Sequence, residues 1–344
     1  MAPQQPGAGG RQWSPQRRVT LEDVAQRAEV SRALVSIVMR DAKGASAPTR
    51  EKVLRAAREL GYRPDVRARS LARQQSGLIG VVFGVAGAFH FDLLEGLYEA
   101  AENRGHDLVL SALTSRRDEQ QALRSLHDFR FDALVMLGPP TAHPLMAGEL
   151  PLAVVGWHVD HPDVDVVRTS DDVGMRVAVE HLAGLGHRDI AHIDGGSQVI
   201  SDSRRAGYRQ AMTAMGLASH VQVIPGGQSQ LDGLHAAEAL LSRRTLPTAV
   251  IAYNDDVAVA AMNALALHGV AVPQDISFVG WDDSEIARLS HVDLTSVAQD
   301  PHRLAALAVD RVLARSDARD IPDREVVLEP ALTIRSSTTT VRPA

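Results

Sequence analysis

The sequence predicts an all-α helix-turn-helix headpiece and a short basic segment, followed by a two-lobed α/β core with parallel sheets. The first observation is a pair of short helical stretches joined by a tight turn within residues 19–41. The second is an alternation of apolar strands and amphipathic helices from residue 78 onward, in two successive series. Such alternation is typical of an open parallel sheet covered by helices.

Charge divides the chain in the same place. Residues 1–76 hold 15 basic and 7 acidic side chains, whereas the rest of the chain holds 21 basic and 35 acidic ones. A basic head on an acidic body indicates that only the head meets a polyanion. Basic faces are often merely solvated, so this signal gains weight because it coincides with the helical pair.

Length and composition exclude several classes of protein. A chain of 344 residues with 45% hydrophobic content can build one small and one or two ordinary domains. The absence of cysteine excludes disulfides and thiolate metal sites. No apolar run is long enough to span a bilayer, and the first residues lack the apolar stretch of a secretory signal. We therefore expect a cytoplasmic protein with no membrane partner, and a disordered tail over residues 1–17.

Capping residues set the limits of the headpiece helices. Thr20 is a good N-cap with Asp23 three residues on, and Ser31 can cap the second helix. Small residues at the crossing fit a helix-turn-helix, although an ordinary helical hairpin in a bundle core has the same spacing. A third helix follows, with Ser46 as its cap and Gly61 as its stop.

A basic segment at residues 64–76 follows the headpiece. It carries Arg67, Arg69 and Arg73 but little apolar surface, so an isolated helix here would be marginal in water. It is either a plain linker or a segment that folds only against DNA.

The core repeats one unit, a buried strand followed by a helix. We expect strands at residues 78–83, 107–113, 132–138, 151–157 and 163–169, then at 189–195, 221–226, 249–255 and 275–283. The helices between them end near Arg104 or cover residues 117–129, 174–185, 204–215, 231–242 and 257–268. A late helix at 301–315, before closing strands, indicates that the chain crosses back to the first lobe.

Enzyme motifs are missing from the sequence. It contains no P-loop, no G-x-G-x-x-G after the first core strand, no H-E-x-x-H and no nucleophile elbow. His187, Asp189, His192 and Asp194 are close in sequence, but a strand there would send alternate side chains to opposite faces. We therefore predict no enzyme activity, no cofactor and no metal.

The chain resembles the lactose-repressor (LacI/GalR) family of bacterial transcription regulators over nearly all of residues 19–338. The resemblance rests on several strings in family order and spacing, namely VTLEDVAQRAEVSRALVS, TREKVLRAARELGYRPD, ARSLA, AVEHLAGLGHRDIAHI, YNDDVAVAAM, DISFVGWDD, LTSVAQD and LEPALTIRSST.

This resemblance implies a transcriptional regulator, usually a repressor, that binds a pseudo-palindromic operator as a homodimer. The core would resemble periplasmic sugar-binding proteins and hold a sugar-like effector between its lobes. The implied domains are a tail at 1–17, a headpiece at 18–63, a hinge at 64–76 and a core at 77–340. Within the core, the first lobe would take about 77–185 and 299–326, and the second about 186–298 and 327–340.

By the same resemblance, the recognition helix spans residues 31–40. Arg32 and Ala33 occupy the positions on which base choice depends, since Arg can bind guanine and Ala can pack on a thymine methyl. Leu71, in a hinge helix at 65–73, would be a wedge in the minor groove. The implied DNA-binding residues are Thr20, Ser31, Arg32, Ala33, Ser36, Arg40, Thr49, Arg69 and Leu71.

Two residues depart from the family pattern. Ile37 stands where an Arg is common, so a guanine contact at that position cannot form here. Glu29 stands where a turn Gly is usual, which costs about 1 kcal/mol if the residue is left-handed. Operator preference should therefore not be taken from relatives.

Effector-binding residues follow from the same resemblance, at the C-terminal ends of the core strands. They are Phe89, His90, Asp172, Arg204, Asn254, Asp282 and Gln299. The alignment with the family is uncertain by one residue at this point, so Asp171 is the alternative to Asp172. An aspartate at the end of a strand is also a common helix cap, which is the structural alternative for these acidic residues. Trp157 and Trp281 are either stacking groups or core residues.

Two other functions remain open at this point. One is a small-molecule binding protein with a non-functional headpiece. The other is a DNA-binding regulator that answers to a protein partner.

Overall fold

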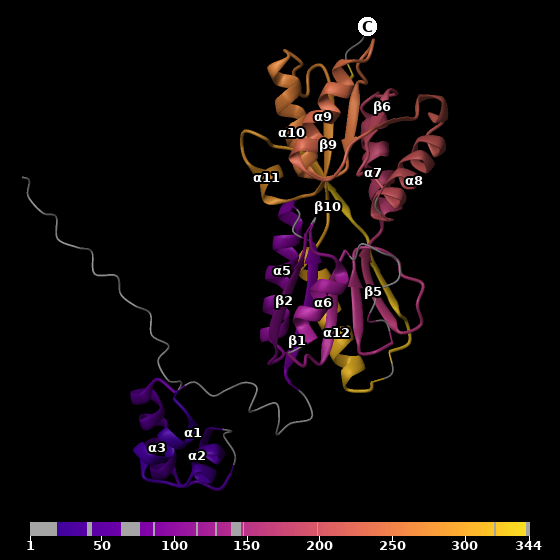
Figure 1. Ribbon diagram of the computed structural model, residues 1–344. Coiled ribbons are helices and arrows are strands. Elements are labelled where there is room, and N and C mark those ends of the chain that lie inside the picture. The colour runs from indigo at the N-terminus through magenta and orange to yellow at the C-terminus, as the bar shows by residue number, and fades with distance from the viewer. Residues whose placement is uncertain are drawn as a thin grey trace, which may run out of the picture. The chain divides into compact units, whose positions relative to one another are not determined.

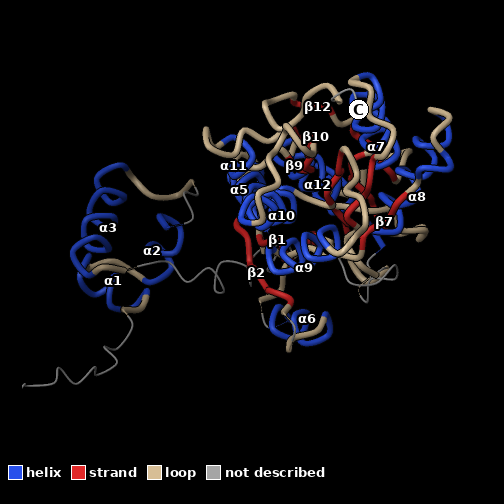
Figure 2. Tube along the Cα trace, turned by 90° about the horizontal axis from the view of Figure 1, so that it is seen from above, coloured by secondary structure: helices blue, strands red, loops and turns tan. Residues whose placement is uncertain are grey.

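The computed structural model describes residues 19–39, 43–62, 76–84, 87–114, 116–127, 129–138, 146, 148–197, 199–319 and 321–341. The chain forms two compact units, Met1–Ser76 and Gly77–Ala344 (Figure 1). The first is helical where it is described, and the second mixes helices with strands (Figure 2). The expected tail at 1–17, the expected hinge helix at 65–73, and Arg40, Arg69 and Leu71 lie outside the described residues.

Three helices form the headpiece, as predicted. They are α1 (Leu21–Ala28), α2 (Arg32–Met39) and α3 (Ala47–Leu60). Thr20 and Asp23 exchange the reciprocal hydrogen bonds of a capping box, and Ser46 caps α3. Val24, Val35 and Val53, one from each helix, are fully buried against one another. The expected capping residues therefore set the starts of α1 and α3, and the buried valines hold the three helices together.

The turn between α1 and α2 has a left-handed residue. Glu29 has φ 50° and ψ 46°, a conformation in which its β-carbon crowds the backbone. Its carboxylate accepts a hydrogen bond of 2.8 Å from Lys52 Nζ, and this contact holds the pKa of Glu29 below its ordinary value. The strain expected for a non-glycine residue at this position is therefore present.

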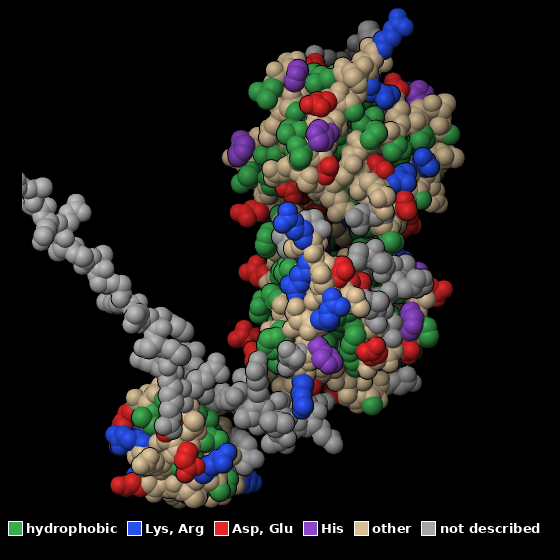
Figure 3. Space-filling model, in the orientation of Figure 1, with side chains coloured by type: hydrophobic (Ala, Val, Ile, Leu, Met, Phe, Trp, Pro, Cys, Tyr) green, Lys and Arg blue, Asp and Glu red, His purple; other side chains and the backbone are tan. Residues whose placement is uncertain are grey.

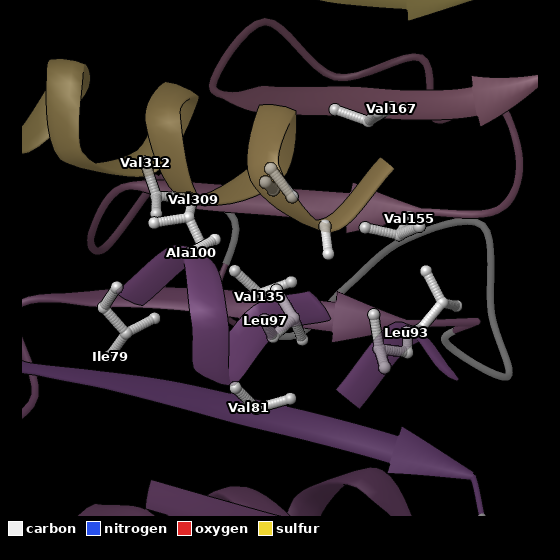
Figure 4. Packing of buried hydrophobic residues seen from close by; sticks show 14 of the residues in the cluster. Ile79, Val81, Leu93, Leu97, Ala100, Val135, Val155, Val167, Val309 and Val312 are labelled. Carbon is white, nitrogen blue, oxygen red and sulfur yellow. The ribbon is translucent and has the colours of Figure 1, made fainter. Parts of the chain in front are cut away.

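The first lobe of the core is a six-stranded parallel sheet. Its order is β11-β5-β4-β3-β1-β2. The strands are β1 (Leu78–Gly84), β2 (Asp107–Leu113), β3 (Ala133–Leu137), β4 (Leu152–Val155), β5 (Val164–Thr169) and β11 (Glu325–Leu328). Helices α5 (Gly87–Glu102) and α12 (Pro301–Ser316) cover one face, where Leu97 and Val309 pack on Val135 (Figure 4). Helix α6 (Glu119–His127) packs on the other face.

The second lobe has the same design. Its sheet order is β12-β10-β9-β8-β6-β7, and only β12 runs antiparallel to its neighbour. The strands are β6 (Ile190–Ile193), β7 (Gln222–Ile224), β8 (Ala249–Ala252), β9 (Ser277–Asp282), β10 (Thr295–Ala298) and β12 (Ala331–Thr333). Helices α7 (Asp171–Gly184) and α8 (Val199–Ala214) cover one face, and α9 (Gln230–Leu241) and α10 (Asp255–Leu267) the other. The short α11 (Glu285–Arg288) follows β9.

The chain passes between the lobes three times, after β5, after β10 and after β11. The return of α12 to the first lobe was predicted, and its packing against α5 confirms it. Two boundaries differ from those expected. Helix α7 packs with α8 in the second lobe, so the first lobe ends near residue 170 rather than 185. Strand β11 pairs with β5, so the last crossing follows Leu328 rather than residue 326.

Helix α7 can lie on the second sheet because Gly174 has no side chain. A β-carbon at this position would overlap the ring of Trp281, which is fully buried on β9. Among the described residues, no helix combines the length and the apolar composition that crossing a bilayer requires.

Replacing Glu29 by glycine should stabilise the headpiece, because glycine adopts the left-handed conformation without a steric cost. We expect the thermal midpoint of the headpiece transition, followed by circular dichroism, to rise on the order of a few degrees. Glu29→Gln is the matched control, since it keeps the strain and removes only the charge that faces Lys52. A glycine variant that melts below the wild type would contradict this account.

Gly174→Ala should destabilise the core, since the added methyl group must displace Trp281 or shift α7. Overpacking of this kind costs roughly 1–3 kcal/mol, measurable by urea unfolding. The control is Gly184→Ala at the end of the same helix, where a β-carbon meets nothing within 4 Å. That change should raise the free energy of unfolding by about 0.5 kcal/mol. Equal effects of the two substitutions would sink this interpretation.

Candidate functional site

A cavity of about 340 Å³ lies in the core where residues of both lobes meet. The first lobe contributes the start of α5 and the ends of its strands, and the second contributes the start of α8 and the ends of β8 and β9. Of the residues expected to meet an effector, six line it, namely Phe89, His90, Arg204, Asn254, Asp282 and Gln299. The cavity therefore stands at the carboxyl ends of parallel strands, as expected.

Asp172 is the expected site residue that does not line this cavity. It is exposed, and its carboxylate accepts a hydrogen bond of 2.6 Å from the Ser170 hydroxyl, which lowers its pKa. Its neighbour Asp171 is buried and faces Arg204. One residue along a helix turns a side chain by about 100°, so the alternative register puts the inward carboxylate on Asp171.

Arg204 is a buried cation whose position is fixed from several sides. Its Nε donates to Asp171 Oδ1 at 3.1 Å, and its Nη1 donates to the backbone carbonyl of Tyr253 at 2.6 Å. The guanidinium lies 4.7 Å from the Tyr253 ring centre and 4.2 Å from that of Trp281, distances typical of cation–π contacts. Nη2 makes no hydrogen bond with any described residue, so it remains available as a donor at the cavity.

Asn254 combines a structural contact with its place in the cavity wall. Its Oδ1 accepts from Val257 N at 2.8 Å and so caps α10, while its Nδ2 donates to the Gln228 carbonyl at 3.0 Å. The second amide proton and the second lone pair of Oδ1 are left over for a ligand. Asn254 therefore caps α10 and also lines the cavity.

Asp282 ends β9 in a strained backbone conformation. Its φ is 108° and that of Asp283 is 50°, both unusual for residues with a β-carbon. Gln299 Nε2 donates to Asp282 Oδ1 at 2.7 Å. Burial raises the pKa of Asp282, while nearby Arg204 opposes this rise and buried Asp255 adds to it. Strained backbone held beside a cavity is common at ligand sites.

The first-lobe wall contains residues that sequence reasoning did not assign. Trp157, left open between stacking and packing, lies two residues after the end of β4 and lines the cavity. Trp281 does not line it and instead packs against the Arg204 guanidinium. Thr114, Thr169, Gln228 and Tyr253 also line the cavity and were not predicted. The sequence could have indicated only two of these residues. Thr114 and Tyr253 directly follow strands, where a ligand site is expected, but they belong to no recognisable motif.

His187 and His192, considered above as metal ligands, have other contacts. His187 bonds to the Thr248 hydroxyl and to the Thr339 carbonyl, while fully buried His192 bonds to the Ile251 carbonyl. Burial lowers the pKa of His192 to about 4. Within the described parts of the chain, no group of three or more acidic, His or Cys side chains is arranged to hold a metal ion.

The first turn of α2 is the exposed edge of the headpiece. Ser31, Arg32 and Ala33 are all exposed, and Ser31 Oγ accepts from Leu34 N at 3.2 Å. Ser36 and Ile37 are half-buried, and Ile37 lies beside Gly44 rather than projecting freely. Arg32 is thus the one basic side chain exposed in that turn.

Thr20 and Thr49 stand at the starts of α1 and α3. Thr20 Oγ1 is engaged with Asp23, and Thr49 Oγ1 with Ser46, so both hydroxyls also serve helix caps.

Comparison with known proteins matches both units. Residues 20–65 match the family model for bacterial regulatory proteins of the lacI family, and residues 179–338 match a periplasmic binding protein-like domain. The ribose operon repressor of Haemophilus influenzae is 30% identical over 92% of this chain and 98% of its own length. The HTH-type transcriptional repressor PurR of Pasteurella multocida is 31% identical over 92% of this chain and 98% of its own.

Solved structures agree with these sequence matches. A LacI transcriptional regulator from a Rhodococcus species is 40% identical, with a TM-score of 0.73 over 77% of this chain and 99% of its own. The lac repressor dimer bound to operator and the anti-inducer ONPF is 31% identical, with a TM-score of 0.83 over 94% of this chain and 100% of its own. The headpiece matches the family model, and a repressor that is 30% identical covers 92% of the chain: the chain belongs to the lacI family of bacterial regulatory proteins.

Proposed function

We propose that this chain is a cytoplasmic transcriptional repressor that binds a pseudo-palindromic operator as a homodimer. A small-molecule effector, a sugar or related metabolite, occupies the cavity between the core lobes and controls operator binding. The proposal depends on one observation: the same chain contains an exposed first turn of α2, suited to DNA, and a cavity on which polar groups converge. The relatives are repressors and regulators by name, which agrees with the prediction that the chain is not an enzyme.

On the DNA side, α2 is the helix that enters the major groove. Exposed Arg32 reads guanine with two hydrogen bonds, and Ala33 packs on a thymine methyl. Ser31 and Ser36 position the headpiece on phosphates, and Thr20, Thr49 and Arg69 are further DNA contacts. Half-buried Ile37 makes no base-specific hydrogen bond, so base readout shifts to Arg32 and Arg40.

On the core side, the proposed effector residues are Phe89, His90, Arg204, Asn254, Asp282 and Gln299, with Asp171 replacing Asp172 in a supporting position. The fixed guanidinium of Arg204 and the carboxylate of Asp282 offer a donor and an acceptor in the same cavity. One relative is named as the repressor of a ribose operon, and one structural neighbour is a transcriptional regulator in complex with cellobiose. The family therefore leaves the identity of this effector open.

A response to a protein partner is the remaining alternative on the core side. The cavity favours a small molecule, because polar groups from both lobes converge on one pocket of small-molecule size. A headpiece without function is less favoured, because Arg32 and the turn around it remain exposed.

Operator binding tests the proposal directly. Selection from a random DNA pool should return a pseudo-palindrome, and its affinity can be followed by fluorescence anisotropy at several salt concentrations. Arg32→Ala should weaken binding by about 1–3 kcal/mol and relax preference at one base pair in each half-site.

The matched control is Arg55→Ala. Arg55 is also an exposed arginine, but it lies on α3 and pairs with Glu51. It should leave base preference unchanged. A pool that yields no enriched sequence, or an Arg32→Ala variant with unaltered preference, would argue against this function.

A further inference from the structure

A second pocket, the crossing pocket, has a volume of about 400 Å³ and lies where the chain crosses between the lobes. Three of its lining residues end crossing strands, namely Thr169 of β5, Ala298 of β10 and Leu328 of β11. The other lining residues are Gln299, Asp300, Arg303, Val327, Glu329 and Ala331. The pocket is large enough for a small molecule, and a ligand in it would contact all three links between the lobes.

The floor of the crossing pocket has unused hydrogen-bonding groups. Thr169 is 4% exposed, and its Oγ1 has no hydrogen-bond partner among the described residues. A buried hydroxyl without a partner is costly, so it favours a ligand or water that can bond to it. Gln299 Nε2 donates to Asp282, which leaves Gln299 Oε1 as a free acceptor. Both residues also line the effector cavity around Arg204, so the nature of a ligand here depends on the groups that line the crossing pocket alone.

Three exposed charged side chains line the crossing pocket and not the effector cavity. Arg303 and Glu329 make no side-chain hydrogen bond or ion pair with any described residue. Asp300 Oδ1 accepts from Arg303 N at 2.9 Å and caps α12, whereas Asp300 Oδ2 has no partner among the described residues. One guanidinium and two carboxylates are therefore available to a ligand.

The charged side chains close to these in the sequence already have partners. His302 pairs with Glu99, Arg168 pairs with Glu325, and Asp172 accepts from a neighbouring hydroxyl. Charged side chains of both signs are scattered over both lobes on the face that Figure 3 shows, so an unpaired charge is not by itself a site. The crossing pocket differs because charges of opposite sign line one space and still do not pair with each other.

This arrangement favours a ligand that carries both signs of charge. An anion alone would be attracted by the guanidinium and repelled by the two carboxylates, and a cation alone would meet the reverse. A zwitterion can place its carboxylate on Arg303 and its ammonium group on Glu329, each through charge-assisted hydrogen bonds. Val327 and Ala331 add an apolar wall to the same pocket, which suits a short apolar side chain.

From these contacts we infer that the crossing pocket is a second ligand site, distinct from the effector cavity, and that it takes a free α-amino acid or a zwitterion of similar size. Arg303 binds the carboxylate, and Glu329 and Asp300 bind the ammonium group. Thr169 and the Oε1 of Gln299 supply the hydrogen bonds at the floor. Occupancy of this site is a property of the core in addition to the proposed effector control.

A thermal-shift series on the full chain with the common L-α-amino acids tests this assignment. We expect at least one of them to raise the melting temperature, and titration calorimetry then gives its dissociation constant. Its methyl ester, which lacks the carboxylate, and its N-acetyl derivative, which lacks the ammonium group, should each bind at least about ten-fold more weakly. If no amino acid binds, or if either derivative binds as tightly as its parent, the assignment is wrong.

Arg303→Gln and Glu329→Gln locate the bound amino acid. Both side chains are exposed, so the substitutions should leave the fold intact, and each should raise the dissociation constant by about ten-fold. Arg303→Gln should also remove the difference between the amino acid and its methyl ester. The matched control is Arg188→Gln, at an exposed arginine of the second lobe that lines neither pocket, and it should change neither value.

His90→Ala distinguishes the two sites, because His90 lines the effector cavity and not the crossing pocket. Loss of amino-acid binding in His90→Ala, together with unchanged binding in Arg303→Gln, would place the amino acid in the effector cavity and overturn the inference. These measurements need no operator. They can therefore fail while the proposed function stands, and a failure of operator binding leaves them unaffected.

Discussion

The site depends above all on one buried ion pair, Arg204 with Asp171. The pair is held by the Tyr253 carbonyl and by two aromatic rings, and Trp281 can take its place only because α7 has a glycine where the ring lies. Breaking a buried pair leaves an uncompensated charge and typically costs 3–5 kcal/mol. The position of α7, the end of β9 and the donor offered to a ligand are thus consequences of one contact.

A second contact joins the site to the crossings between the lobes. The Asp282 side chain belongs to the second lobe, and Gln299 lies where the chain leaves β10 for α12 of the first lobe. A ligand that donates a hydrogen bond to the Asp282 carboxylate would contact the same side chain that accepts from Gln299 at this crossing. The strained backbone at Asp282 and Asp283 is consistent with a position kept for binding rather than for stability.

Local capping rules and strand-helix alternation predicted most of the fold. Thr20, Asp23 and Ser46 marked helix starts because side-chain caps are local interactions. The assignment of α7 to the first lobe was wrong, because strand–helix alternation does not say which sheet a helix covers. The packing of Gly174 on Trp281 shows that α7 covers the second sheet. The cavity wall came from family resemblance rather than from periodicity. The choice between Asp171 and Asp172 stayed open because a one-residue register cannot be resolved without the helix. The role of Trp157 stayed open because a tryptophan near the end of a strand fits core and site equally.

The central claim is that occupancy of the cavity controls operator binding, which makes the two sites thermodynamically coupled. The direct measurement is the dissociation constant of a selected operator, determined by anisotropy with and without a compound that raises the melting temperature of the chain. We predict a change of about five-fold or more, in either direction, at saturating compound. A compound that saturates the cavity and leaves the operator dissociation constant unchanged would contradict the claim.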